Sequence, residues 1–218
     1  REFFSRFASG IIWGILTVVF LAVTVRGFSY LTNLFGSIPA STLASLTNEG
    51  ALFVVFVQPL TETILIVSGM LFVYGRIRNS VPFAMPIAIV SIAMLFAGFH
   101  FAVEGKDYYE YSLAGFINFI GDVKGYGQEG YHGGFPYLML GIFWLALAVI
   151  YKNFVEPFAA HLTYNYFVLL ITTTTPGVRE LLYVLGIALF LIVVFSYRFT
   201  GMRMLENYKI SRLTGDLK

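Results

Sequence analysis

Six continuous apolar stretches, each near the length that a helix needs to cross a lipid bilayer, limit what this chain can fold into. A helix crosses the hydrocarbon core with about 20 mainly apolar residues. The stretches do not alternate between apolar and polar residues, and an open sheet edge in lipid would leave backbone groups without partners, so strands are not expected. The six predicted spans lie near residues 8–26, 50–75, 83–104, 135–152, 154–174 and 177–198.

The composition agrees with a membrane protein. Of the 218 residues, 12% are charged and 58% are hydrophobic, whereas a soluble domain carries roughly twice that charged fraction. No polar block is large enough to form a second, soluble domain. The first apolar stretch is too long for the core of a signal peptide, and we expect it to be a retained span. The predicted fold class is therefore all-α: a polytopic membrane helical bundle of about six transmembrane helices, forming a single membrane domain over residues 1–218.

Three segments lie outside the predicted spans. Residues 27–49 mix apolar and small polar side chains and could lie along the membrane interface, and the basic tail, about residues 199–218, is expected on the membrane surface. Residues 105–134 form the longest polar stretch, which is interpreted either as an ordinary outer loop or as a lid or docking element. A very tight turn at Lys152 and Asn153 predicts that the fourth and fifth spans are antiparallel neighbours.

The distribution of Lys and Arg predicts the orientation of the chain, because cytoplasmic loops carry an excess of both. With six spans, both termini share one side with the second and fourth loops. That side holds ten of the fourteen basic residues: Arg1, Arg6, Arg76, Arg78, Lys152, Arg198, Arg203, Lys209, Arg212 and Lys218. We therefore expect an integral plasma membrane protein with both termini in the cytoplasm. The net charge of +2 gives no support to nucleic-acid binding.

Among the polar residues of the predicted spans, four are candidates for a site: Glu62 in the second span, His100 in the third, and His161 and Asn165 in the fifth. An ionisable group near the bilayer centre costs several kcal/mol, so it faces the protein interior and often has a function. His161 and Asn165 are four residues apart and share one face of a helix. Gln58 stands in the same relation to Glu62. If the three helices converge, they bring together a carboxylate, two imidazoles and an amide.

These groups could hydrolyse an amide without a nucleophilic Ser or Cys. Glu62 together with a His could hold and deprotonate a water. The other His and Asn165 could donate hydrogen bonds to a carbonyl oxygen as it gains charge. Each residue also has a structural interpretation: an intramembrane Glu can pair with a His on a neighbouring helix, and Asn often joins helices by hydrogen bonds. The three spans that carry these residues contain no Lys or Arg that could neutralise Glu62.

The sequence around these residues resembles the CPBP family of CAAX-protease and bacteriocin-processing enzymes, which carries the intramembrane motifs E-E-x-x-x-R, F-x-x-x-H and H-x-x-x-N in this order. The second motif runs from Phe96 to His100, and the third from His161 to Asn165. Pro59, three residues before Glu62, is typical of the family and aligns Glu62 with its first Glu. The resemblance covers a CPBP-like core of about residues 55–170.

The resemblance implies a bacterial or archaeal intramembrane endopeptidase that hydrolyses peptide bonds of a membrane-associated protein or peptide without a cofactor. It assigns Glu62 and His100 to water activation, and His161 and Asn165 to the oxyanion site. Two positions depart from the pattern, because Thr63 replaces the second Glu and Val67 replaces the Arg. These departures favour an alternative, in which a catalytically impaired chain of the same fold is a subunit or partner of another membrane protein.

Three further interpretations remain open. Two His and a Glu can ligate zinc, although no H-E-x-x-H pair and no Cys supports a metal site. Two His on separate helices could clamp a haem, which would not need the neighbouring carboxylate and amide. A small-molecule transporter would be expected to show an inverted repeat or a pair of broken helices, and the sequence shows neither.

Overall fold

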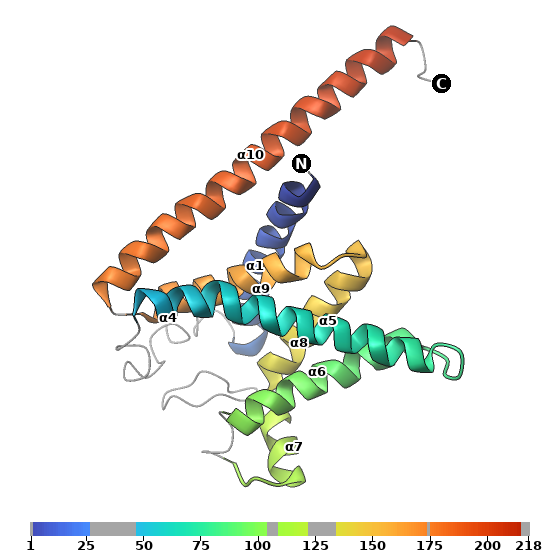
Figure 1. Ribbon diagram of the computed structural model, residues 1–218, viewed down its shortest axis with the longest axis vertical. Coiled ribbons are helices and arrows are strands. Elements are labelled where there is room, and N and C mark those ends of the chain that lie inside the picture. Colours follow the sequence, from blue (N-terminus) through green and yellow to red (C-terminus); the bar gives the residue numbers. More distant parts are fainter. Residues whose placement is uncertain (1, 27–46, 104–108, 122–133, 174, 215–218) are drawn as a thin grey trace.

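The computed structural model describes residues 2–26, 47–103, 109–121, 134–173 and 175–214, without the side chains of 20–26, 171–172 and 197–214. The described residues form helices and contain no strand (Figure 1). The predicted interfacial segment therefore lies outside the described residues up to residue 46. The same holds for His132 and most of the polar stretch 105–134.

The chain order of the described elements follows the apolar stretches of the sequence. The second span is one continuous helical stretch made of α4, a π-helical turn (η2) and α5. A short helix, α7, lies within the polar stretch and was not predicted. The bounds are α1 Glu2–Arg26, α4 Asn48–Leu52, η2 Phe53–Val57, α5 Gln58–Ile77, α6 Ala84–Val103, α7 Leu113–Gly121, α8 Phe135–Tyr151, α9 Val155–Thr172 and α10 Pro176–Thr214.

Four helical stretches in the described part of the chain are long and apolar enough to cross a membrane: Glu2–Val19, Asn48–Ile77, Ala84–Val103 and Pro176–Ser196. They indicate membrane association. The other two predicted spans are also helices, but α8 has 17 residues and α9 contains Glu156, His161 and Asn165. All six predicted spans are therefore helical, and the count of six crossings stays a prediction.

Large apolar side chains cover much of the outer surface. Leu65, Phe72 and Leu95 are each more than 60% exposed, as are Ile187 and Phe190. So many large, strongly exposed apolar side chains are unusual on soluble monomers. Lipid tails would surround it without the unfavourable exposure to water, so the exposed surface agrees with a membrane environment.

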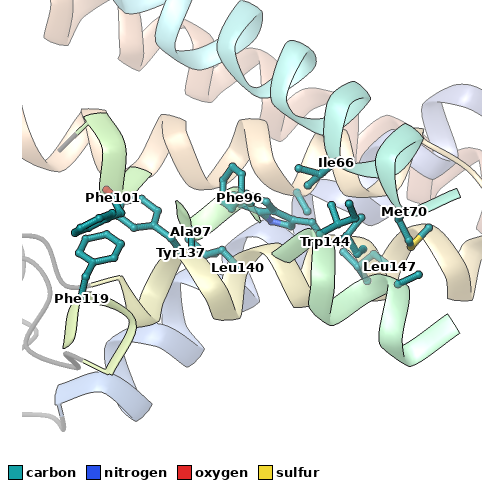
Figure 2. Packing of buried hydrophobic residues seen from close by; sticks show 14 residues of the cluster. Ile66, Met70, Phe96, Ala97, Phe101, Phe119, Tyr137, Leu140, Trp144 and Leu147 are labelled. Atoms are coloured by element: carbon teal, nitrogen blue, oxygen red, sulfur yellow. The ribbon is translucent and has the colours of Figure 1, made fainter. Parts of the chain in front are cut away.

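Two clusters of buried side chains form the interior. The first joins α5, α6, α7 and α8, with Trp144 of α8 near its middle, and Ala160 of α9 also belongs to it (Figure 2). The second joins α1, the α4–η2 stretch, α9 and α10. Because α9 contributes to both clusters, its side chains lie between the two halves of the bundle. His161 follows Ala160 directly and is therefore in the centre of the protein.

Helix α1 crosses α9 at very short range (Figure 1). A Cβ atom at Gly10 would lie 2.5 Å from the Glu156 carbonyl oxygen, and one at Gly14 would lie 2.6 Å from the Cβ of Thr163. Helices within membranes often associate through small residues that allow their backbones to approach. The spacing of the two glycines thus brings α1 against the helix that carries His161.

The turn between α8 and α9 is as short as predicted. Lys152 has a left-handed backbone (φ 52°) that ends α8. The Asn153 amide donates to the Tyr151 carbonyl at 2.8 Å, and its oxygen accepts from the backbone N–H groups of Val155 and Glu156 at 2.8 and 3.3 Å. Asn153 therefore caps α9, and α8 and α9 pack against each other.

The predicted basic tail continues α10 as a helix up to Thr214. With 39 residues, α10 is about 58 Å long at about 1.5 Å per residue. This is roughly twice the thickness of the hydrocarbon core. The C-terminal part of α10 projects beyond the other helices (Figure 1), instead of forming a separate segment.

Candidate active site

A carboxylate and an imidazole meet between α5 and α9. Glu62 Oε2 lies 3.3 Å from His161 Nε2. The Glu62 side chain is 15% exposed and that of His161 is 2% exposed, so this contact is largely buried within the protein. Facing lone pairs would repel at this distance, and the contact is attractive only when one of the two atoms carries a proton. Glu62 and His161 thus form a pair that can hold and transfer a proton.

Both nitrogens of the His161 imidazole have a neighbour. Thr63 Oγ1 lies 3.2 Å from Nδ1, on the side of the ring away from Glu62. When the Thr63 hydroxyl donates to Nδ1, the imidazole proton lies on Nε2 and faces the Glu62 carboxylate. The indole of Trp144 covers one face of the ring, with centroids 3.6 Å apart and planes 20° apart. Together these contacts fix the orientation of the imidazole.

The Glu62 carboxylate is held by its own helix as well. Gln58 Nε2 donates to Glu62 Oε1 at 2.9 Å. Residues four apart lie above one another on a helix, so the polar stripe predicted from the sequence is present. The two oxygens of Glu62 face different partners, one on α5 and one on α9.

The amide of Asn165 contacts the backbone of the π-helical turn. In this turn the Gln58 N–H bonds to the Phe53 carbonyl, five residues back. The next bond in the same register would run to Val54 from Pro59, which has no N–H. Asn165 Nδ2 donates to the Val54 carbonyl instead, at 3.0 Å. Asn165 therefore compensates for a backbone bond that Pro59 cannot make, a role that sequence reasoning missed although Pro59 is its visible signal.

His100 lies in an aromatic stack next to the pair. It is 7% exposed, and its ring stacks on Tyr137 with centroids 3.8 Å apart. Phe96 contacts His100 edge-on at 4.8 Å and Trp144 at 5.9 Å, and Figure 2 shows Phe96 and Trp144 side by side. Since Trp144 stacks on His161, an aromatic path joins the two imidazoles.

The two departures from the CPBP motifs have defined positions. Thr63 is fully buried and contacts His161, so the residue that replaces the second Glu still reaches the pair. Val67 packs against the first hydrophobic cluster. Neither side chain adds a charge, and Glu62 is the carboxylate in contact with His161.

Trp144 was not among the predicted site residues. Its side chain is 1% exposed, and its indole N–H has no hydrogen-bond partner in the described part of the structure. A buried Trp N–H usually finds a partner. A Trp within an apolar stretch gives no sequence signal for such a position, because the stack on His161 arises from packing between helices.

No protein-family model, no curated protein and no solved structure matches this chain.

A zinc site would need at least three protein ligands close together. Among the described residues, no three His, Asp or Glu side chains gather closely enough to hold a metal ion. Glu62 and the two imidazoles thus do not form a three-ligand set of the kind that zinc enzymes use.

Proposed function

We propose that this chain is an intramembrane endopeptidase, which hydrolyses a peptide bond of a membrane-associated protein or peptide with water activated by Glu62 and His161. The observation that carries the proposal is the 3.3 Å contact between the Glu62 carboxylate and the His161 imidazole on neighbouring helices. An ionisable pair buried between apolar helices is costly, and proton transfer is a use that would retain it.

Each group has a defined part in the proposed reaction. The Glu62 carboxylate takes a proton from water as the water oxygen bonds to the carbonyl carbon of the substrate. His161, held by Thr63 and Trp144, stabilises the carboxyl group and shares its proton. When the C–N bond breaks, this proton passes to the leaving amine and restores the Glu62 carboxylate. The new carboxylic acid then gives its own proton to the released amine, which leaves a carboxylate and an ammonium group. His100 stays a predicted member of the site.

Asn165 is proposed to act mainly through position. The resemblance assigns it to the oxyanion site, but one N–H of its amide is bound to the Val54 carbonyl. That bond fixes α9 against the π-helical turn, directly before the residues that carry Glu62. Asn165 thereby keeps the distance between Glu62 and His161.

A second function is favoured by the number of contacts that the polar groups make within the protein. His161 contacts Glu62 and Thr63, and Asn165 binds Val54. A chain in which these contacts only hold the helices together would be a subunit or partner of another membrane protein. This second function needs no water and no substrate at the Glu62–His161 pair.

New peptide termini distinguish the two functions. The purified chain is reconstituted in liposomes with solubilised bacterial membrane proteins, and new N-termini are identified by mass spectrometry. Glu62→Gln keeps an acceptor for Gln58 but cannot act as a base, and Glu49→Gln makes the same change at an exposed position on the same helical stretch. We expect the wild type and Glu49→Gln to produce the same termini, and Glu62→Gln to produce them at least about 100-fold more slowly. Termini that form in Glu62→Gln as fast as in the wild type would exclude the proposed base.

A result without any new termini from the wild type would argue against an endopeptidase. If the chain then copurifies in a fixed ratio with one membrane protein, and Glu62→Gln leaves that ratio unchanged, the second function is supported.

A further inference from the structure

We infer that the indole N–H of Trp144 is a hydrogen-bond donor for the carbonyl oxygen of a bound peptide, next to the Glu62–His161 pair. The inference deepens the proposed function and rests on it for the class of substrate. The donor itself rests on the position of Trp144, which is independent of any assumption about catalysis.

The indole N–H of Trp144 is buried and has no acceptor among the described residues. Trp144 is among the most completely buried large side chains, at 1% exposure, and no acceptor for its Nε1 is present among the described residues. A buried N–H without an acceptor is unfavourable, and such groups in native proteins call for an explanation. A ligand oxygen that occupies the position only during binding is one explanation with a function.

The donor lies beside the His161 imidazole. The indole lies parallel to the His161 imidazole, with centroids 3.6 Å apart. An acceptor within about 3 Å of Nε1 would therefore be a neighbour of the His161 ring. His161 in turn contacts Glu62, the group proposed to activate water. A carbonyl oxygen at this place would be held beside the base.

The chemistry of the indole N–H determines which ligand atoms it can bind. An indole N–H donates and cannot accept, so it selects an oxygen acceptor such as an amide carbonyl. Unlike a His or a carboxyl group, the indole also cannot act as an acid or a base toward a water molecule at the Glu62–His161 pair. Phe96 contacts the indole edge-on at 5.9 Å, which limits its rotation and keeps the donor in one direction.

The other Trp in the chain differs from Trp144 because its indole N–H has an acceptor. The chain has two Trp residues, and Trp13 Nε1 donates to the Tyr151 hydroxyl at 2.9 Å, joining α1 to α8. Trp13 thus shows the ordinary structural use of an indole N–H in this fold. Trp144 has the same donor in a more buried position, without an acceptor among the described residues.

The two indoles allow a direct spectroscopic test. Selective ¹⁵N labelling of Trp in the full chain in nanodiscs gives two indole signals, and Trp13→Phe assigns them. The probe is N-acetyl-phenylalaninamide, a small amide with carbonyl oxygens, and the control probe is hexylbenzene, which has none. We expect the amide to move the Trp144 indole proton downfield, to leave the Trp13 signal in place, and to do so equally in Glu62→Gln. A Trp144 signal that does not move, or that moves equally with hexylbenzene, would overturn the inference.

Kinetics separate a donor from a packing residue. Trp144→Phe keeps an aromatic ring on His161 but removes the N–H, and Trp13→Phe removes an indole N–H outside the site. Loss of one donor to a developing oxyanion lowers kcat by roughly 100-fold or more. We expect such a loss in kcat, with a smaller change in KM, for Trp144→Phe, and only a lower unfolding temperature for Trp13→Phe. An unchanged kcat in folded Trp144→Phe would contradict a donor role.

The two proposals fail in different ways. If the wild type hydrolyses nothing, the proposed function is wrong, and the indole spectra still show whether Trp144 binds a carbonyl oxygen. If hydrolysis depends on Glu62 but neither the spectra nor kcat responds at Trp144, only the inference about Trp144 is wrong.

Discussion

At the scale of single residues, the arrangement around His161 shows how a polar side chain is kept inside an apolar bundle. Its two nitrogens contact Glu62 and Thr63, and its face is covered by Trp144. A buried polar group is unfavourable unless it has partners, so these three neighbours account for its position. The same contacts leave the imidazole in one orientation, which proton transfer requires.

The Thr63 contact is tested by Thr63→Val, which has nearly the same shape but lacks the hydroxyl. The buried Nδ1 of His161 then loses its neighbour. We therefore expect the free energy of unfolding to fall by about 1–3 kcal/mol and hydrolysis to slow. Thermal unfolding in micelles measures the first effect. The control is Thr61→Val, whose exposed hydroxyl bonds only to the Val57 carbonyl of its own helix. Equal effects at the two positions would show that the Thr63 contact is unimportant.

Part of this site could be predicted from the sequence. Glu62 and His161 were predicted because they are costly side chains in apolar stretches, and they are in contact. Which of the two imidazoles faces Glu62 depends on how the helices rotate, and the sequence alone does not determine this. Trp144 could not be predicted, since an aromatic residue in an apolar span has the same pattern whether it stacks on a His or faces lipid.

At the scale of helices, the π-helical turn and Asn165 depend on each other. Asn165 donates to the Val54 carbonyl, which the missing N–H of Pro59 leaves without a backbone donor in the π-helical register. π-Helical turns often occur at functional sites, and this one directly precedes the helix that carries Glu62. The sequence predicted the span and its Pro but not the change of register, because apolar periodicity over five residues does not distinguish the two kinds of helix.

A double-mutant cycle tests this dependence. Asn165→Leu alone should destabilise the protein by about 1–3 kcal/mol, since the Val54 carbonyl loses its donor. In a Pro59→Ala background, the new backbone N–H can bond to Val54, and the cost of Asn165→Leu should fall by at least about 0.5 kcal/mol. Unfolding of the four proteins gives the coupling. The same cost in both backgrounds would contradict this account of Asn165.

The crossing of α1 and α9 makes a second prediction at this scale. In Gly10→Ala the new methyl group would meet the Glu156 carbonyl oxygen at 2.5 Å, whereas a Cβ at Gly75 would meet no described atom within 4 Å outside its own helical turns. We expect Gly10→Ala to destabilise the protein by about 1–3 kcal/mol. Gly75→Ala should be neutral or stabilising, because Ala is the better helix former by about 1 kcal/mol. Thermal unfolding of both variants compares them directly, and equal unfolding temperatures would mean that α1 and α9 are not closely packed.

The helix boundaries illustrate what patterns can and cannot predict. The predicted span 83–104 corresponds to α6, Ala84–Val103, because the apolar run has clear ends. Helix α7 was missed, since nine residues are too few to be recognised beside stretches of membrane-spanning length. The basic tail was predicted to lie on the membrane surface, which stays a prediction, and its backbone continues α10 as a helix to Thr214.

At the scale of the whole molecule, the number of crossings and the orientation can be measured cleanly because the chain has no Cys. Six spans place Ser80, between α5 and α6, on the same side as Lys152, between α8 and α9. Both positions are exposed, as is Glu110 before α7. The excess of Lys and Arg predicts that the first two are cytoplasmic and the third is outside.

Single Cys variants at these positions test the prediction with a membrane-impermeant maleimide. Glu110→Cys should be labelled in intact cells, and Ser80→Cys and Lys152→Cys only after the membrane is permeabilised. Labelling of Ser80→Cys and Lys152→Cys from opposite sides would contradict the six-span arrangement, since α6 and α8 would then not both cross.

Water activation by Glu62 and His161 has one decisive measurement. This is the rate at which the purified chain cleaves the peptide identified from new termini, compared between the wild type and Glu62→Gln. Removing a general base slows catalysis by about 10²–10⁴-fold, and we predict a loss in that range, with Glu49→Gln unchanged. Cleavage by Glu62→Gln at the wild-type rate would contradict the account.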